Sequence, residues 1–169
     1  EYRGYDSCGV AVVRDGEIDR ARSVARVKDL AEQVRAEGMH GTVGIAHTRW
    51  ATHGGPVVAN AHPHIAGNRI ALVHNGIIEN YMELREFLQS EGITFVSQTD
   101  TEVVAQLLEH YYDGDILDAV VKTLNRIQGA YALGIVCADC PDRLIAARKD
   151  SPLILGYGEG AHYLASDVT

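Results

Sequence analysis

Gly9-Val10-Ala11-Val12-Val13 is a short, wholly apolar run, and Arg14-Asp15-Gly16 follows it directly. A β-branched run of this kind is typical of a buried strand. An Asp-Gly pair after such a run is the strongest short-range signal for a tight hairpin turn. We therefore expect a strand, a turn and a polar return strand near Ile18.

Helical periodicity begins after this hairpin. Apolar residues repeat at i, i+3, i+4 and i+7 from Val27 to Val34, and Gly38 then acts as a stop signal, so we expect a helix over 27–37. A second helix is predicted over 81–91, with Asn80 as its cap and Gly92 at its end. The Thr99–Glu102 capping-box pattern predicts a third helix, and a fourth is predicted from Asp115 to Ile127.

Further apolar runs predict strands between these helices. They lie at 42–46, 70–73, 130–136, 144–147, 152–155 and 162–165, with a brief strand at Phe95–Val96. Strands in hairpin-like groups with helices between them indicate an α+β fold in which two sheets are covered by helices. We expect residues 1–169 to form a single domain.

Composition restricts the class of protein. The chain has 169 residues, 46% hydrophobic and 22% charged, which are values of an ordinary globular domain. Its formal net charge of -8 argues against a nucleic-acid or anionic-membrane surface. No apolar run is long enough to span a bilayer. The three cysteines are too few for a disulfide framework, so a reducing cytoplasm is expected.

A long segment rich in His, Gly and Pro follows the strand at 42–46, and five of the eight histidines lie between positions 47 and 74. Arg49 offers a planar fork of N–H donors that suits a carboxylate or phosphate. Alternatively, the side chains of Arg49 and Trp50 stack on each other and have only a structural role. His62 and His64, with His47 or His53, suggest a metal site instead. A metal is disfavoured because no acidic residue lies between Glu37 and Glu79.

Two further features carry possible chemistry. Asn75 and the Gly76 N–H could donate to a developing oxyanion, or could form a simple Asn-Gly turn. Asp100 is either an ordinary first-turn acid of its helix or the partner of a substrate ammonium.

The cysteines favour structural roles. Cys137 and Cys140 have the spacing of a redox pair but end a strand rather than open a helix. Cys8, beside a buried strand, is expected to fill the core.

Five blocks of the sequence occur in the order of a known family. They are Glu1-Tyr2-Arg3-Gly4-Tyr5-Asp6-Ser7, His47-Thr48-Arg49-Trp50-Ala51-Thr52-His53-Gly54, Asn60-Ala61-His62-Pro63-His64, Val73-His74-Asn75-Gly76-Ile77-Ile78-Glu79-Asn80 and Thr99-Asp100-Thr101-Glu102. These blocks resemble the glutaminase domain of the isomerising glutamine–fructose-6-phosphate aminotransferases (glucosamine-6-phosphate synthases), which are class II glutamine amidotransferases. The amidophosphoribosyltransferases, a sister family, look different at the second and fourth blocks.

The resemblance implies the N-terminal-nucleophile hydrolase fold, a four-layer αββα sandwich, here lacking its first strand. In the family, an N-terminal cysteine thiol attacks the side-chain amide of glutamine, with its own α-amino group as base. The thioester is hydrolysed to glutamate. The ammonia travels to a sugar isomerase domain that converts fructose 6-phosphate to glucosamine 6-phosphate, and no cofactor is implied.

The resemblance also implies roles for residues at matching positions. Asn75 and the Gly76 N–H would form the oxyanion hole. Arg49 would bind the α-carboxylate of glutamine and Asp100 its α-ammonium. The remaining expected site residues are the pocket residues Thr52, His53 and His62, the hydrophobic gate Trp50, and Arg3 as support for the nucleophile.

One departure from the family matters for activity. The family's cysteine lies upstream of the block that begins at Glu1, so this sequence does not contain it. We expect the chain to be truncated at both ends, to lack the isomerase domain and to be inactive alone. The parent protein is expected to be a cytoplasmic homo-oligomer. A non-catalytic amino-acid-binding module and, less favoured, a histidine-ligated metalloprotein remain as alternatives.

Overall fold

The computed structural model describes residues 4–168, and its first element is the predicted hairpin. The 9–13 run lies in β1 (Ser7–Arg14), and the chain returns through β2 (Glu17–Ser23) in antiparallel register. Asp15 and Gly16 both have positive φ, 53° and 75°, as a two-residue turn between twisted strands requires. β3 (Val43–Arg49) pairs with the other side of β1 and completes a sheet of order β2-β1-β3.

A second antiparallel sheet has the order β4-β5-β6-β7. Its strands are β4 (His64–Ala66), β5 (Ile70–Gly76), β6 (Tyr131–Cys137) and β7 (Ile145–Lys149). β8 (Ile154–Gly158) and β9 (Ala161–Ala165) form a separate hairpin. The short strand β4 and the 3-10 turn η1 (Val58–Asn60) fall in the segment that the sequence predicted as a loop.

The four predicted helices are present. They are α1 (Val27–Glu37), α2 (Tyr81–Ser90), α3 (Asp100–Tyr111) and α4 (Ile116–Leu124). Gly38, with φ 69°, ends α1, and the Asp115 carboxylate caps α4 by accepting from the N–H groups of Leu117 and Asp118. α4 ends before the predicted Ile127.

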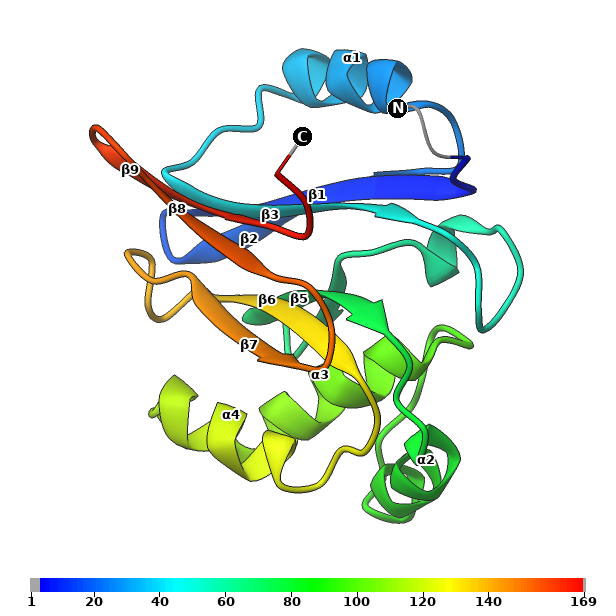
Figure 1. The fold of residues 1–169 in the computed structure, drawn as a ribbon. Helices are drawn as coiled ribbons and strands as arrows, with labels where there is room; N and C mark the ends of the chain where they lie inside the picture. The colour runs from blue at the N-terminus through cyan, green and yellow to red at the C-terminus, as the bar shows by residue number, and fades with distance from the viewer. Residues whose placement is uncertain (1–3, 169) are drawn as a thin grey trace.

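Apolar clusters separate the layers. Cys8, Ala21 and Leu30 pack between α1 and the first sheet. A second cluster, which includes Ala11, Ile45, Ala71 and Val136, lies between the sheets. The largest lies between the second sheet and α2–α4. Figure 1 shows α1 on one side of the paired sheets and the other helices on the opposite side. The predicted α+β, αββα architecture is confirmed.

Two local predictions are wrong. Phe95–Val96 is not a strand, because the buried Glu102 carboxylate accepts from the N–H groups of Val96 and Ser97, donors that a strand would give to its neighbour. Because the Glu102 carboxylate is used in this way, only one half of the predicted capping box forms. Thr99 Oγ1 accepts from the Glu102 N–H at 3.2 Å. The Asn80 side chain does not cap α2; it donates to Arg126 O and accepts from Gln128 N.

Across residues 4–168, no helix combines the length and apolar character that crossing a bilayer requires.

Candidate active site

A cavity of about 1320 Å³ opens beside the ends of β3 and β5 and the start of α3, and extends to α1 and the β8–β9 hairpin. Eight of the nine predicted site residues line it: Arg49, Trp50, Thr52, His53, His62, Asn75, Gly76 and Asp100. The ninth, Arg3, lies outside the described residues. The structure thus brings together residues that are up to 51 positions apart in the sequence, from Arg49 to Asp100.

Asn75 and Gly76 are the last two residues of β5. The Asn75 side-chain oxygen Oδ1 lies 2.7 Å from His47 Nε2, which leaves the Nδ2 amide group as the end available to donate into the cavity. The N–H of Ile77 donates to Ala130 O, which continues the pairing of β5 with β6. Because N–H groups alternate in direction along an antiparallel strand, the N–H of Gly76, one residue earlier, points away from β6. Both donors therefore remain usable at the cavity.

Asp100 is the first residue of α3 and is buried. Its Oδ2 accepts from the N–H of Ile78 at 2.9 Å, and its Oδ1 lies 3.7 Å from His53 Nδ1. A negative charge at a helix N-terminus is favoured by the helix dipole. The carboxylate therefore ties α3 to the segment that follows Gly76 and gives the cavity one buried anionic group.

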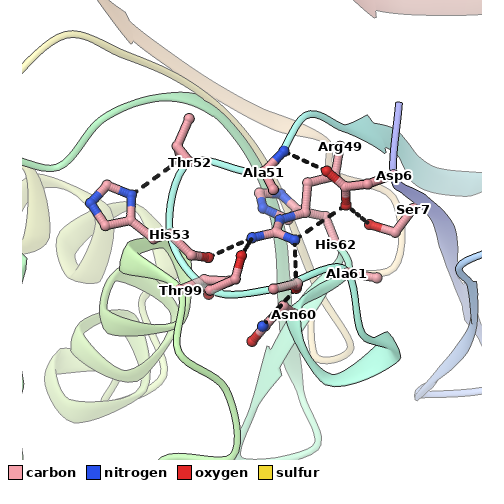
Figure 2. Close-up of polar contacts among 12 residues, drawn as sticks. Asp6, Ser7, Arg49, Ala51, Thr52, His53, Asn60, Ala61, His62 and Thr99 are labelled. Carbon is pink, nitrogen blue, oxygen red and sulfur yellow. Dashed lines mark hydrogen bonds and ion pairs between the residues drawn. The ribbon is translucent and has the colours of Figure 1, made fainter. Parts of the chain in front are cut away.

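The Arg49 guanidinium is buried and occupied by protein groups (Figure 2). Nη1 donates to Asp6 Oδ1 at 3.2 Å and to Gly55 O at 3.1 Å. Nη2 donates to Gly54 O at 3.1 Å and also to His53 O. Arg49 therefore fastens the 53–55 loop to the end of β3 in this structure, and its four terminal N–H groups face these partners.

The loop after Arg49 carries the other predicted pocket residues. Trp50 is 72% exposed. Thr52 Oγ1 lies 3.1 Å from His53 Nδ1, and the His53 ring packs edge-on against Tyr81 with centroids 4.7 Å apart. Asn60 connects this loop to the segment before α3, because its Nδ2 donates to Gly55 O and its Oδ1 accepts from the N–H of Gln98.

Four histidines form a cluster at the cavity, and three of them, His47, His62 and His74, line it. The rings of His47 and His62 stack at 4.0 Å, and His62 also contacts the rings of His64 and His74. Burial lowers the pKa of all four, to about 3 for His64 and about 4 for His74. The cluster is therefore uncharged near neutral pH, and His62 contributes to the cavity wall as a neutral ring.

The geometry gives no support to the histidine–metal hypothesis. His47 and His62 meet face to face, with 12° between their planes, so their nitrogens do not converge on a point. Within the part of the chain that the structure describes, no group of three His, Cys, Asp or Glu residues could hold a metal ion.

The cysteines are placed as the sequence predicted. Cys8 is buried between α1 and the first sheet, where its thiol donates to Ala25 O at 3.5 Å. Cys137 ends β6, and burial raises the pKa of its thiol. Cys140 follows in a turn closed by its N–H on Cys137 O. Neither side chain of this pair lines the cavity.

Two residues at the site carried no predicted role in binding or hydrolysing glutamine, although the sequence suggested His47 as a metal ligand. The Asp6 carboxylate accepts from Arg49 and from the N–H of Ala51, which is 45 positions later in the sequence. No local sequence pattern predicts a contact over this separation. His47 could have been found, because residues i and i+2 of a strand share a face and Arg49 was already a candidate.

The comparison with protein families defines the class. Residues 47–169, which include the eight predicted site residues that line the cavity, match the glutamine amidotransferase domain family. This chain belongs to that family.

Individual relatives are more specific. The chain is 54% identical over 169 residues to the isomerising glutamine–fructose-6-phosphate aminotransferase of Caldanaerobacter subterraneus subsp. tengcongensis. It is 55% identical over 173 residues to the enzyme of the same name from Bordetella pertussis. Each match covers 99% of this chain and 28% of the relative, so the chain spans little more than a quarter of these curated relatives.

Solved structures agree on the fold. A glutamine phosphoribosylpyrophosphate amidotransferase from B. subtilis superposes with a TM-score of 0.82 at 26% identity, over 96% of this chain and 36% of that one. A structure described as the allosteric regulatory enzyme of purine biosynthesis gives 0.84 at the same identity and the same coverage. The identity to the fructose-6-phosphate enzymes is about twice as high.

Proposed function

We propose that this chain is the glutamine-hydrolysing domain of an isomerising glutamine–fructose-6-phosphate aminotransferase. Within the complete protein, this domain binds glutamine and releases glutamate and ammonia. The rest of the parent protein, a sugar isomerase domain, uses the ammonia to convert fructose 6-phosphate to glucosamine 6-phosphate. The identity of 54–55% to enzymes of that name, over 99% of this chain, supports this proposal.

The observation that carries the proposal is the pair of donors at the end of β5. Attack on the side-chain amide of glutamine moves negative charge onto the amide oxygen. Donors fixed in advance at the position of that charge stabilise the transition state. Asn75 Nδ2 and the Gly76 N–H are adjacent donors on one strand end beside the cavity.

Charged groups in the cavity would orient the substrate. Asp100 is the buried anion that would accept the α-ammonium of glutamine, and Arg49 is the fork that would bind its α-carboxylate. Arg49 already donates to the carbonyls of 53–55, so presenting the fork requires those carbonyls to move away. We expect the 53–55 loop, with Thr52 and Trp50, to rearrange when glutamine binds.

The attacking thiol is not Cys8. Cys8 lines the end of the cavity next to α1, where its thiol is hydrogen-bonded to Ala25 O. In the β1–β3 register Cys8 pairs with Thr48, so its side chain and that of His47, which holds Asn75, point to opposite faces of the first sheet. A thiol from outside these residues is needed, with its α-amino group as base. We therefore expect residues 1–169 alone to be inactive. Support of that nucleophile by Arg3, cytoplasmic location and homo-oligomeric assembly of the parent remain predictions.

Replacement of Asn75 by Ala tests the proposal. In the protein expressed from its complete reading frame, this variant should release glutamate from glutamine about 10²–10³ times more slowly, the usual effect of losing one oxyanion donor. The exposed Asn125→Ala, at the end of α4, is the matched control and should keep the full rate. An unchanged rate for Asn75→Ala would refute the oxyanion assignment. Tight glutamine binding without glutamate release by the unmodified protein would favour the amino-acid-binding module.

A further inference from the structure

We infer that His47 is a positioning residue that fixes the side-chain amide of Asn75 with its N–H groups, rather than its oxygen, toward the substrate. The inference rests on the proposed function and names a residue to which the resemblance assigned no role.

The contact joins the two sheets. His47 lies on β3 of the first sheet and Asn75 on β5 of the second. His47 Nε2 and Asn75 Oδ1 are 2.7 Å apart, a full-strength hydrogen bond. A carbonyl oxygen can only accept, so Nε2 must carry the proton and donate it.

The direction of this bond decides whether an oxyanion hole exists. The two ends of an asparagine amide have nearly the same shape, and the surrounding hydrogen bonds select which end faces which way. With Oδ1 held by His47, Nδ2 is left to donate to a developing oxyanion. Rotated by half a turn, the amide would instead present lone pairs to that negative charge, which is repulsive.

The surroundings of His47 hold its ring in one state. Burial lowers the pKa of His47 more than its hydrogen bonds to the Asn75 side chain and the His74 backbone raise it, so the ring is neutral near pH 7 and carries a single proton. The contact with Asn75 Oδ1 assigns that proton to Nε2, because a carbonyl oxygen can only accept. Stacking against His62, at 4.0 Å and 12°, fixes the plane of the ring.

Two substitutions separate donation from packing. In the complete protein, His47→Met removes the donor and should lower kcat for glutamate release by about ten- to a hundredfold, less than the loss of Asn75 itself. KM for glutamine should change less than about threefold, because the substrate's charged ends are bound elsewhere. His47→Gln restores an N–H at similar reach and should recover most of kcat. If His47→Met does not fold, His47→Asn, whose amide is too short to reach Oδ1, replaces it with the same expectation.

The double variant gives the decisive comparison. If His47 acts only through Asn75, His47→Met should have no further effect on kcat in an Asn75→Ala background. Losses that multiply, or a Gln variant as slow as the Met variant, would overturn the positioning role. Failure of the proposed function looks different, because Asn75→Ala alone would then leave the rate unchanged.

Discussion

At the scale of single residues, the end of β5 shows why particular side chains stand where they do. Gly76 has φ 115°, a backbone conformation that L side chains rarely adopt. A Cβ at this position would also overlap the carbonyl oxygen of Ala130. Glycine is therefore required there by backbone and by space, and it leaves the N–H next to Asn75 uncovered.

Arg49→Lys tests whether Arg49 binds the α-carboxylate of glutamine. Lysine offers one point charge in place of a planar fork, and it cannot hold Asp6 and three carbonyls at once. We expect the KM for glutamine in the complete protein to rise by about tenfold or more. The exposed Arg143→Lys should leave KM as it is. A KM for Arg49→Lys equal to that of the control would mean that Arg49 serves only the loop.

At the scale of elements, local signals predicted structure where the determinants are local. The bounds of α1 agree with the sequence because its apolar spacing and the Gly38 stop both lie within the segment. β4 was missed because three residues carry no readable period. The error at Phe95–Val96 came from Glu102, a side chain that no pattern in the segment reveals.

Glu102→Gln tests that explanation. The carboxylate accepts from the N–H groups of Val96 and Ser97, whereas an amide would turn one of its own donors toward them. Leaving a buried donor unsatisfied destabilises a protein by about 1–3 kcal/mol. We expect the thermal unfolding midpoint of the variant to fall by several degrees relative to the exposed Glu86→Gln. Equal midpoints for the two variants would show that the segment is held by other contacts.

At the scale of the whole molecule, the layered fold could be predicted, whereas the interior polar network could not. Hairpin and helix signals led to two covered sheets, and three apolar clusters bear this out. Eight of the residues that the sequence predicted for the site line one cavity. No sequence pattern indicated that Arg49 is occupied by loop carbonyls, because those bonds depend on how the loop folds back.

The buried histidines make stability depend on pH. An unfolded histidine has a pKa of about 6.5, whereas burial in the folded protein lowers the pKa of His64 to about 3 and that of His74 to about 4. Between these values the unfolded state binds more protons, so stability is lost as pH falls below about 6.5, by about 1.4 kcal/mol per pH unit for each such histidine.

Thermal unfolding followed across the pH range checks this expectation. The midpoint should be nearly constant above about pH 7 and should fall steadily between about pH 6.5 and 4. His64→Gln should make that fall shallower, whereas the exposed His40→Gln serves as the control. A midpoint that stays level from pH 7 to 4.5 would contradict the neutral buried cluster.

The position of bound glutamate in a crystal structure of the complete protein is the best test of whether Asn75 and Gly76 form the oxyanion hole. Glutamate is the expected product, and its side-chain carboxylate should occupy the oxyanion position. We expect that carboxylate within about 3 Å of Asn75 Nδ2 and the Gly76 N–H. The ammonium should lie on Asp100, and the α-carboxylate on Arg49, with the Arg49 guanidinium released from its loop. Glutamate bound in the reverse direction, or outside the cavity, would refute the assignment of Asn75 and Gly76 as the oxyanion hole.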